Sequence, residues 1–87
     1  MTGSYSLVIK KSAERELRTI PKLDLRRVTE RLRGLAQDPR PTGSEKLSGH
    51  DRYRVRQGDY RIVYSVDEET RTVQVVKVGH RREVYRK

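Results

Sequence analysis

The spacing of hydrophobic residues changes near the middle of this 87-residue chain, from helical in the first half to alternating in the second. Residues 5–9 form a short apolar stretch rich in β-formers, which predicts a strand. A helix is expected next, with Ser12 as its N-cap and Pro21 at its end. Its apolar positions recur at steps of three and four: Ala13, Leu17 and Ile20.

A second helix is predicted over about residues 23–37. Its apolar residues recur at steps of three and four, which is typical of a helix with one buried face. These residues are Leu25, Val28, Leu32 and Leu35. Residues 38–43 contain two prolines and a glycine, and we expect them to end the helix.

Beyond this point apolar and polar residues alternate, which predicts strands. The expected strands are residues 53–56, 60–66 and 72–78. Gln57 and Gly58 are expected to form the turn of a hairpin, because glycine supplies the positive φ that such turns need. Gly79 is expected to break the last strand.

This element order, β-α-α-β-β-β, predicts an α+β fold. Both N-terminal helices are expected to pack on one face of a small, largely antiparallel sheet. A chain of 87 residues leaves room for one small core, so residues 1–87 are expected to form a single domain. So short a chain buries a smaller fraction of its surface than a larger domain does, and we expect a thin margin of stability. Only 32% of the residues are hydrophobic and 38% are charged.

Alternation sorts the side chains of the predicted hairpin into two faces. With Gln57 and Gly58 in the turn, Arg54 is expected directly opposite Arg61. The face expected to meet the helices carries Tyr53, Val55, Tyr60, Ile62 and Tyr64. The other face carries Arg52, Arg54, Arg56, Asp59, Arg61 and Val63, and we call its four arginines the arginine face.

The arginine face predicts an anion site. Like charges directly opposite each other destabilise a sheet, and a bound anion would relieve their repulsion. Guanidinium groups bind phosphate through two parallel hydrogen bonds, which suits them to this ligand. The alternative is a solvated face on which the arginine stems lie along the sheet, with Asp59 giving partial neutralisation.

The charge of the whole chain favours the same class of partner. Lys and Arg number 21 and Asp and Glu 12, so the formal net charge is +9, which attracts nucleic acid or an acidic protein. The absence of cysteine excludes a disulfide scaffold and a cysteine nucleophile. With two histidines, neither a metal site nor a cofactor is expected. No apolar run approaches membrane-spanning length and the N-terminus has no signal-peptide core, so we expect no membrane contact and a cytoplasmic location.

The C-terminal segment adds further chemistry to this charge. Arg81 and Arg82 extend the positive surface, and His80 carries an imidazole, which can exchange a proton near neutral pH. Tyr85 offers a ring on which a base could stack. Each also has a structural interpretation: a surface histidine, a tyrosine packed on the sheet edge, and a basic, disordered end of the chain.

Three stretches of the chain, taken together, resemble the sequence pattern of a known protein family. They are residues 46–49 (KLSG), 53–64 (YRVRQGDYRIVY) and 78–85 (VGHRREVY). Together with the element order they resemble the RelE/ParE superfamily, the toxins of type II toxin–antitoxin pairs of bacteria and archaea. The resemblance covers nearly the whole chain and is closer to the RelE branch than to ParE.

In the RelE branch the resemblance implies an endonuclease that enters the ribosomal A site and cuts the mRNA codon there. A 2′-OH attacks the adjacent phosphate without a metal, leaving a 2′,3′-cyclic phosphate and a 5′-OH. Among the family's functional positions, basic residues of its first hairpin strand match Arg54 and Arg56, where the best-studied members have lysines. Its remaining functional residues match Arg61, Arg81 and Tyr85.

We therefore expect a division of roles among these residues. Arg54 and Arg61 hold the phosphate, and Arg81 stabilises charge on the leaving side. His80 is the expected proton-transfer group, because arginine is a poor general base. Tyr85 holds a splayed base. The remaining arginines expected to bind RNA are Arg52, Arg56 and Arg82.

Two other functions remain open from the residues alone. One is the ParE-like inhibition of DNA gyrase by binding, and the other is a non-catalytic RNA-binding or ribosome-binding module. The toxin interpretation also implies a cognate acidic antitoxin as partner, besides the ribosome and mRNA. Operator DNA would then be contacted only indirectly, through the antitoxin.

Overall fold

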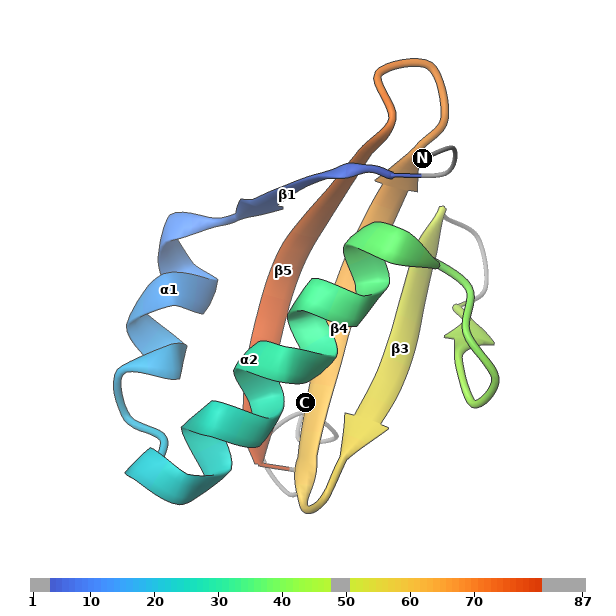
Figure 1. The fold of residues 1–87 in the computed structure, drawn as a ribbon. Coiled ribbons are helices and arrows are strands. Elements are labelled where there is room, and N and C mark those ends of the chain that lie inside the picture. Colours follow the sequence, from blue (N-terminus) through green and yellow to red (C-terminus); the bar gives the residue numbers. More distant parts are fainter. Residues whose placement is uncertain (1–3, 48–50, 81–87) are drawn as a thin grey trace.

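A mixed five-stranded sheet with two helices on one side forms the framework of the protein (Figure 1). The computed structural model describes residues 4–47 and 51–80. Its elements are β1 (Ser6–Ile9), α1 (Lys11–Leu17), α2 (Lys22–Gln37), β2 (Glu45–Lys46), β3 (Arg52–Gln57), β4 (Tyr60–Asp67) and β5 (Thr72–His80). The strand order is β1-β5-β4-β3-β2, and only β1 pairs in parallel, with β5. The expected α+β fold with a largely antiparallel sheet is confirmed.

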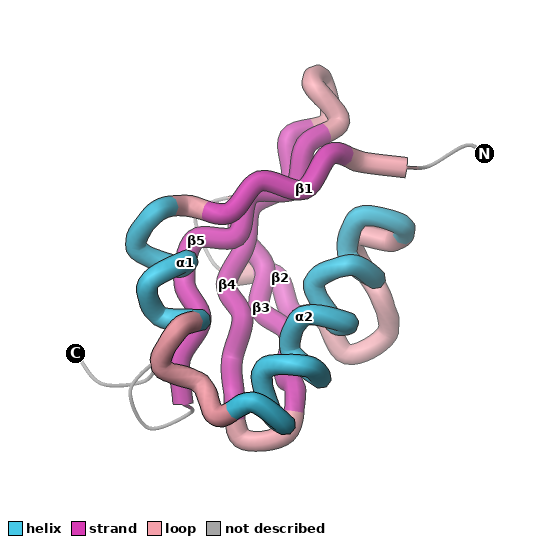
Figure 2. Tube along the Cα trace, turned by 60° about the vertical axis from the view of Figure 1, so that its left-hand side comes forward, coloured by secondary structure: helices cyan, strands magenta, loops and turns pink. Residues whose placement is uncertain are grey.

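The core lies between the helices and the sheet face beneath them. Figure 2 shows the helices and strands from a second direction. The apolar stripe of α2 is confirmed, because three of its four residues are buried and Leu25 packs against them. The buried apolar residues are Ala13, Ile20, Val28, Leu32, Leu35, Val55, Ile62, Tyr64, Val66, Val73, Val75 and Val78. Within the described ranges no helix is long and apolar enough to cross a membrane.

The start of α1 differs from the expectation. Lys10 occupies the N-cap position and makes no side-chain cap, so the predicted capping role of Ser12 is wrong. The Lys10 N–H donates to the carbonyl of Val75 at 2.9 Å, so the chain passes directly from strand pairing into the helix. The helix ends at Leu17, and Pro21 is the N-cap of α2 rather than the residue that ends α1.

The β3–β4 hairpin turns one residue later than expected. Gly58 and Asp59 form the turn, and only Gly58 has a positive φ (59°), which fits a type II′ turn. The predicted Arg54–Arg61 pair is therefore wrong: Arg56 lies opposite Arg61, and Arg54 lies opposite Val63. This one-residue shift of the turn moves the pairing by two positions, so both predicted faces of the hairpin keep their members.

A β-bulge interrupts the pairing of β5 with β4. Val63 lies opposite Lys77, but Tyr64 lies opposite Val75, so Val76 is an extra residue on β5. An extra residue reverses the alternation of side chains beyond it. Before the bulge the odd-numbered residues of β5 face the core, and after it the even-numbered residues do.

Beyond the bulge β5 continues to His80, so the predicted break at Gly79 is wrong. On its outer side β1 has already ended, and α1 covers this part of the strand (Figure 1). Glu16 of α1 accepts a hydrogen bond from the Val78 N–H at 2.9 Å, a donor on the outer side of β5. This contact satisfies a partly buried donor, which keeps the end of β5 extended beside Arg61 of β4.

Tyr64 ties the loop after α2 to the centre of the sheet. Its ring is fully buried, and its hydroxyl donates a hydrogen bond to the Pro39 carbonyl at 2.6 Å. Burial raises the pKa of Tyr64 to about 12, because the ionised phenolate would be poorly solvated there. The contact anchors the loop that leads into β2.

Substitution Tyr64→Phe is expected to lower the free energy of unfolding by about 1–2 kcal/mol at neutral pH, because the Pro39 carbonyl loses its donor. Above the ordinary tyrosine pKa of about 10 the unfolded chain ionises first, so the parent loses stability as pH rises towards 12. The variant should lose less over that window. Urea unfolding at several pH values measures both effects.

Tyr5→Phe is the control, since it removes only a surface hydrogen bond to Glu68 and should change stability less. Equal stability of Tyr64→Phe and the parent at neutral pH would contradict the role given to the Pro39 contact.

Candidate functional site

Three members of the arginine face converge on a small pocket beside the hairpin. The pocket has a volume of about 120 Å³ and is lined by Gly43, Glu45, Arg54, Val55, Arg56 and Arg61. The strand register brings the arginines together: Arg56 lies opposite Arg61, and Arg54 is next along the same face of β3. We call this cavity the arginine pocket. It lies on the face of the sheet opposite the helices.

Arg61 is the one buried charged residue of the described chain, with 6% of its surface exposed. Its neighbour across the ladder on β5 is Gly79, which has no side chain to occupy the space beside it. A guanidinium group stays protonated at any pH that the protein survives. A permanent positive charge is therefore held in a poorly hydrated position, where its attraction for an anion is stronger than in open water.

Glu45 of β2 also lines the arginine pocket. It lies opposite Arg54 and forms an ion pair with it, with side-chain exposures of 63% for Glu45 and 25% for Arg54. The hydrogen bond from Arg54, then its charge, and then the charges of Arg56 and Arg61 lower the pKa of the Glu45 carboxyl. Three positive charges and one negative charge leave the pocket with a net charge of +2.

Sequence reasoning missed Glu45. It belongs to a two-residue strand, which is too short to show an alternating pattern. A glutamate by itself did not indicate a functional site, because 38% of the residues in this sequence are charged. Only the pairing of β2 with β3 brings Glu45 to Arg54.

The remaining predicted site residues lie elsewhere. Arg52 is exposed on the arginine face, opposite Ser65, and does not line the pocket. His80 lies opposite Tyr60, on the face that the helices cover, and the two rings meet edge to face with centroids 5.7 Å apart. The register thus places His80 and Arg61 on opposite faces of the sheet. Arg81, Arg82 and Tyr85 lie outside the described residues.

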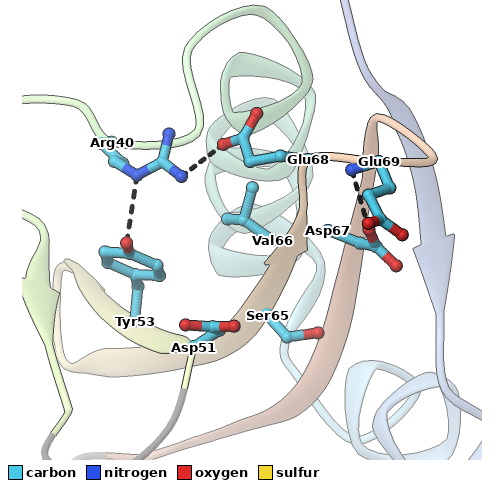
Figure 3. Close-up of a pocket in the computed structure, with 8 residues that line it drawn as sticks. All are labelled: Arg40, Asp51, Tyr53, Ser65, Val66, Asp67, Glu68 and Glu69. Carbon is cyan, nitrogen blue, oxygen red and sulfur yellow. Dashed lines mark hydrogen bonds and ion pairs between the residues drawn. The ribbon is translucent and has the colours of Figure 1, made fainter.

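A larger cavity of about 540 Å³ lies at the other end of the β3–β4 hairpin, where acidic residues gather (Figure 3). It is lined by Arg40, Asp51, Tyr53, Ser65, Val66, Asp67, Glu68 and Glu69. Arg40 donates to the Tyr53 hydroxyl at 3.0 Å and pairs with Glu68, whose pKa is lowered by that contact. These contacts clamp the loop after α2 to the β4–β5 turn, which indicates a structural role.

The chemistry available in the arginine pocket is that of anion recognition. Several guanidinium groups can share one phosphate, and they stabilise additional negative charge if the phosphate reacts. Among residues 4–47 and 51–80, no group of three or more histidine, aspartate or glutamate side chains is placed to hold a metal ion.

Comparison with known proteins points to one superfamily. The family model described as ParE toxin of type II toxin-antitoxin system, parDE, matches residues 7–85 of the chain. Toxin RelG of Mycobacterium tuberculosis is 32% identical, and the match covers 95% of this chain and 98% of RelG.

Solved structures with the same fold lead to the same superfamily. A RelBE2 toxin–antitoxin complex from Mycobacterium tuberculosis contains a chain that is 28% identical, with a TM-score of 0.81 over 92% of this chain and 94% of that one. The archaeal RelE–RelB complex from Pyrococcus horikoshii gives 31% identity and a TM-score of 0.78 over 90% and 96%. The isolated RelE toxin of E. coli gives 29% and 0.79 over 88% and 84%.

Inorganic phosphate is expected to bind the arginine pocket and raise the melting temperature. At ten times its dissociation constant, a ligand that binds only the folded state adds about 1.4 kcal/mol, which shifts the melting temperature of so small a domain by several degrees. Arg56→Ala should reduce this shift, because it removes an exposed guanidinium from the pocket. Thermal unfolding over a phosphate titration at constant ionic strength measures it.

Arg33→Ala is the matched control: it removes the same charge from an exposed position on α2, away from the pocket. An equal loss of the phosphate effect in both variants would show general charge screening and contradict a defined site.

Proposed function

The chain belongs to the ParE toxin family of type II toxin–antitoxin systems, within the RelE/ParE superfamily, and we propose that it is a ribosome-dependent endoribonuclease of the RelE type. It cuts mRNA in the codon at the ribosomal A site and thereby inhibits translation. The 2′-OH of a nucleotide attacks the adjacent phosphate, so DNA, which lacks that hydroxyl, is not a substrate.

The observation that carries this proposal is the arginine pocket. Cleavage by a 2′-OH concentrates negative charge on the phosphate in the transition state, and fixed cations at that point lower the barrier. Arg54 and Arg61 line one pocket, and the burial of Arg61 strengthens its attraction for an anion, which supports the proposal.

The roles proposed for Arg81 and Tyr85 follow from the resemblance described above: Arg81 stabilises charge on the leaving oxygen, and Tyr85 stacks on a splayed base. Arg52, Arg56 and Arg82 bind RNA through their positive charge. His80 is the proton-transfer group expected from the sequence. The strand register places His80 and Arg61 on opposite faces of the sheet, so His80 does not line the arginine pocket.

Inhibition of DNA gyrase by binding is the second candidate function. The observation that favours it is that the matching family model is that of the ParE toxin. Both functions share one fold, and a fold does not determine function. The two candidates differ in substrate: gyrase inhibition reduces DNA supercoiling and leaves mRNA intact. A non-catalytic RNA-binding module would also leave mRNA intact, but its affinity would fall steeply with salt.

We further propose that the chain is neutralised by a cognate acidic antitoxin in the cytoplasm. Several solved relatives are complexes of a RelE toxin with a RelB antitoxin. A net charge of +9 suits a negatively charged partner, and a segment laid over the arginine face would block access of RNA phosphate. Contact with operator DNA would then run through the antitoxin.

Cleavage of a defined mRNA on programmed ribosomes tests the enzymatic function, with primer extension to map the ends and free mRNA as control. The parent should cut within the A-site codon. Arg54→Ala should lower the single-turnover rate by roughly 10²–10³-fold, because it removes one cation from the transition-state phosphate. Cosedimentation with ribosomes should be largely retained.

Arg33→Ala again serves as the matched charge control and should cleave like the parent. Intact mRNA after incubation with a folded, growth-inhibiting parent protein would overturn the endonuclease assignment. A gyrase supercoiling assay would then decide whether the protein acts in the ParE manner.

A further inference from the structure

A carboxylate of α1 binds the last part of β5 through both of its oxygens. Glu16 Oε1 accepts a hydrogen bond from the Val78 N–H at 2.9 Å, and Glu16 Oε2 accepts one from the Lys77 ammonium at 2.8 Å. The side chain of Glu16 is 31% exposed, and both contacts are partly buried. Glu16 therefore joins a helix near the start of the chain to a strand near its end.

The contact lies where β5 has no neighbouring strand on its outer side. β1 pairs with β5 only as far as Val75, and α1 lies beside the strand beyond that point (Figure 1). In an antiparallel pair the amide groups of successive residues point alternately towards and away from the partner strand. The Val78 N–H is directed to Glu16 and away from β4, so at this position the carboxylate replaces the carbonyl of a missing strand.

The β-bulge makes this part of β5 dependent on such a contact. Val76 is the extra residue, and a bulge disrupts the hydrogen-bonded ladder around it. Glu16 contacts Lys77 and Val78, the two residues that directly follow the bulge. It thus holds the strand on the course in which Gly79 lies opposite Arg61.

The end of β5 in turn forms part of the surroundings of Arg61. Arg61 lies on β4 between β3 and β5, with 6% of its surface exposed. If the end of β5 moved away, water would reach this side of β4 and weaken the attraction of the guanidinium for phosphate. β5 also ends one residue before Arg81, to which the resemblance assigns a role in cleavage.

We propose that Glu16 is a positioning residue for the cleavage reaction. It holds the end of β5 against β4, so that Arg61 stays buried beside Gly79 and the strand leads into Arg81 from a fixed point. The inference rests on the proposed endoribonuclease function. Glu16 does not line the arginine pocket, so it acts through the backbone of β5 and touches no substrate.

The competing interpretation is that Glu16 contributes only to the stability of the fold. Its ion pair with Lys77 is partly exposed, and such pairs contribute little. If Glu16 acts on stability alone, a variant that is fully folded at the assay temperature should cleave like the parent. If Glu16 positions the end of β5, the folded variant should bind ribosomes normally and cleave slowly.

The test uses Glu16→Ala in single-turnover cleavage on programmed ribosomes, at a temperature where melting curves show the parent and the variant fully folded. At saturating protein we expect the rate to fall by roughly 10–100-fold, because small misplacements of reacting groups reduce rates on this scale. The protein concentration that gives half-saturation should stay close to that of the parent, since Glu16 is outside the pocket.

Three further variants separate the backbone contact from the ion pair and from net charge. Glu16→Gln keeps an oxygen that can accept from the Val78 N–H, so it should recover most of the rate. Lys77→Met removes only the ion pair, so it should keep the rate at saturating protein. Glu14→Ala is the matched charge control, because it removes a carboxylate from an exposed position of α1 and should cleave like the parent.

Hydrogen exchange of the free protein tests the positioning itself, independently of cleavage. In Glu16→Ala the amide of Val78 should exchange faster than in the parent, because its acceptor is gone and the strand end opens more often. The amide of Val73, at the opposite end of β5, should exchange as in the parent. Equal protection of Val78 in both proteins would contradict the role given to Glu16.

The cleavage results decide between the two interpretations. A parent-like rate of folded Glu16→Ala would overturn the inference and leave the endoribonuclease function intact. An equal loss of rate in Glu14→Ala would trace the effect to net charge and would also overturn it. Absence of cleavage by the parent itself would overturn the proposed function and the catalytic role of Glu16 with it.

Discussion

The buried guanidinium of Arg61 is the constraint on which the functional surface depends. A charge withdrawn from water must be compensated nearby, and the Glu45 carboxylate, which pairs with Arg54, lines the same pocket as Arg61. Such an arrangement requires that the charged groups of the pocket stay out of the apolar core on the other face of the sheet. The valine-rich core on the helix side supplies the stability, at about 1.5–3 kcal/mol for each fully buried side chain.

The sheet therefore separates the apolar core from the charged arginine pocket. The helix face holds nearly all of the buried apolar residues, while the arginine face holds the pocket. Charge is also divided along the hairpin: cations gather near the turn, and carboxylates gather at the other end around Arg40. This separation favours the hairpin turn, rather than the opposite end of the hairpin, as the place where a polyanion binds.

Membership of the toxin superfamily and the geometry of the pocket answer different questions. The family match and the solved relatives establish the kind of protein, and they group ParE and RelE toxins on one fold. The chemistry must come from side chains. In this chain three guanidinium groups and one carboxylate line one small cavity, an arrangement suited to binding a phosphate.

The alternating residues of β3 and β4 determined by themselves that the arginines share a face, and the spacing of Val28, Leu32 and Leu35 determined the buried side of α2. These signals are local, because the periods of strand and helix fix which side chains point together. Only the tertiary structure decided that Glu45 joins Arg54 and that the bulge at Val76 turns His80 towards the helices. Both depend on which strands pair and in what register, and pairing is set by contacts between segments that are distant in the chain.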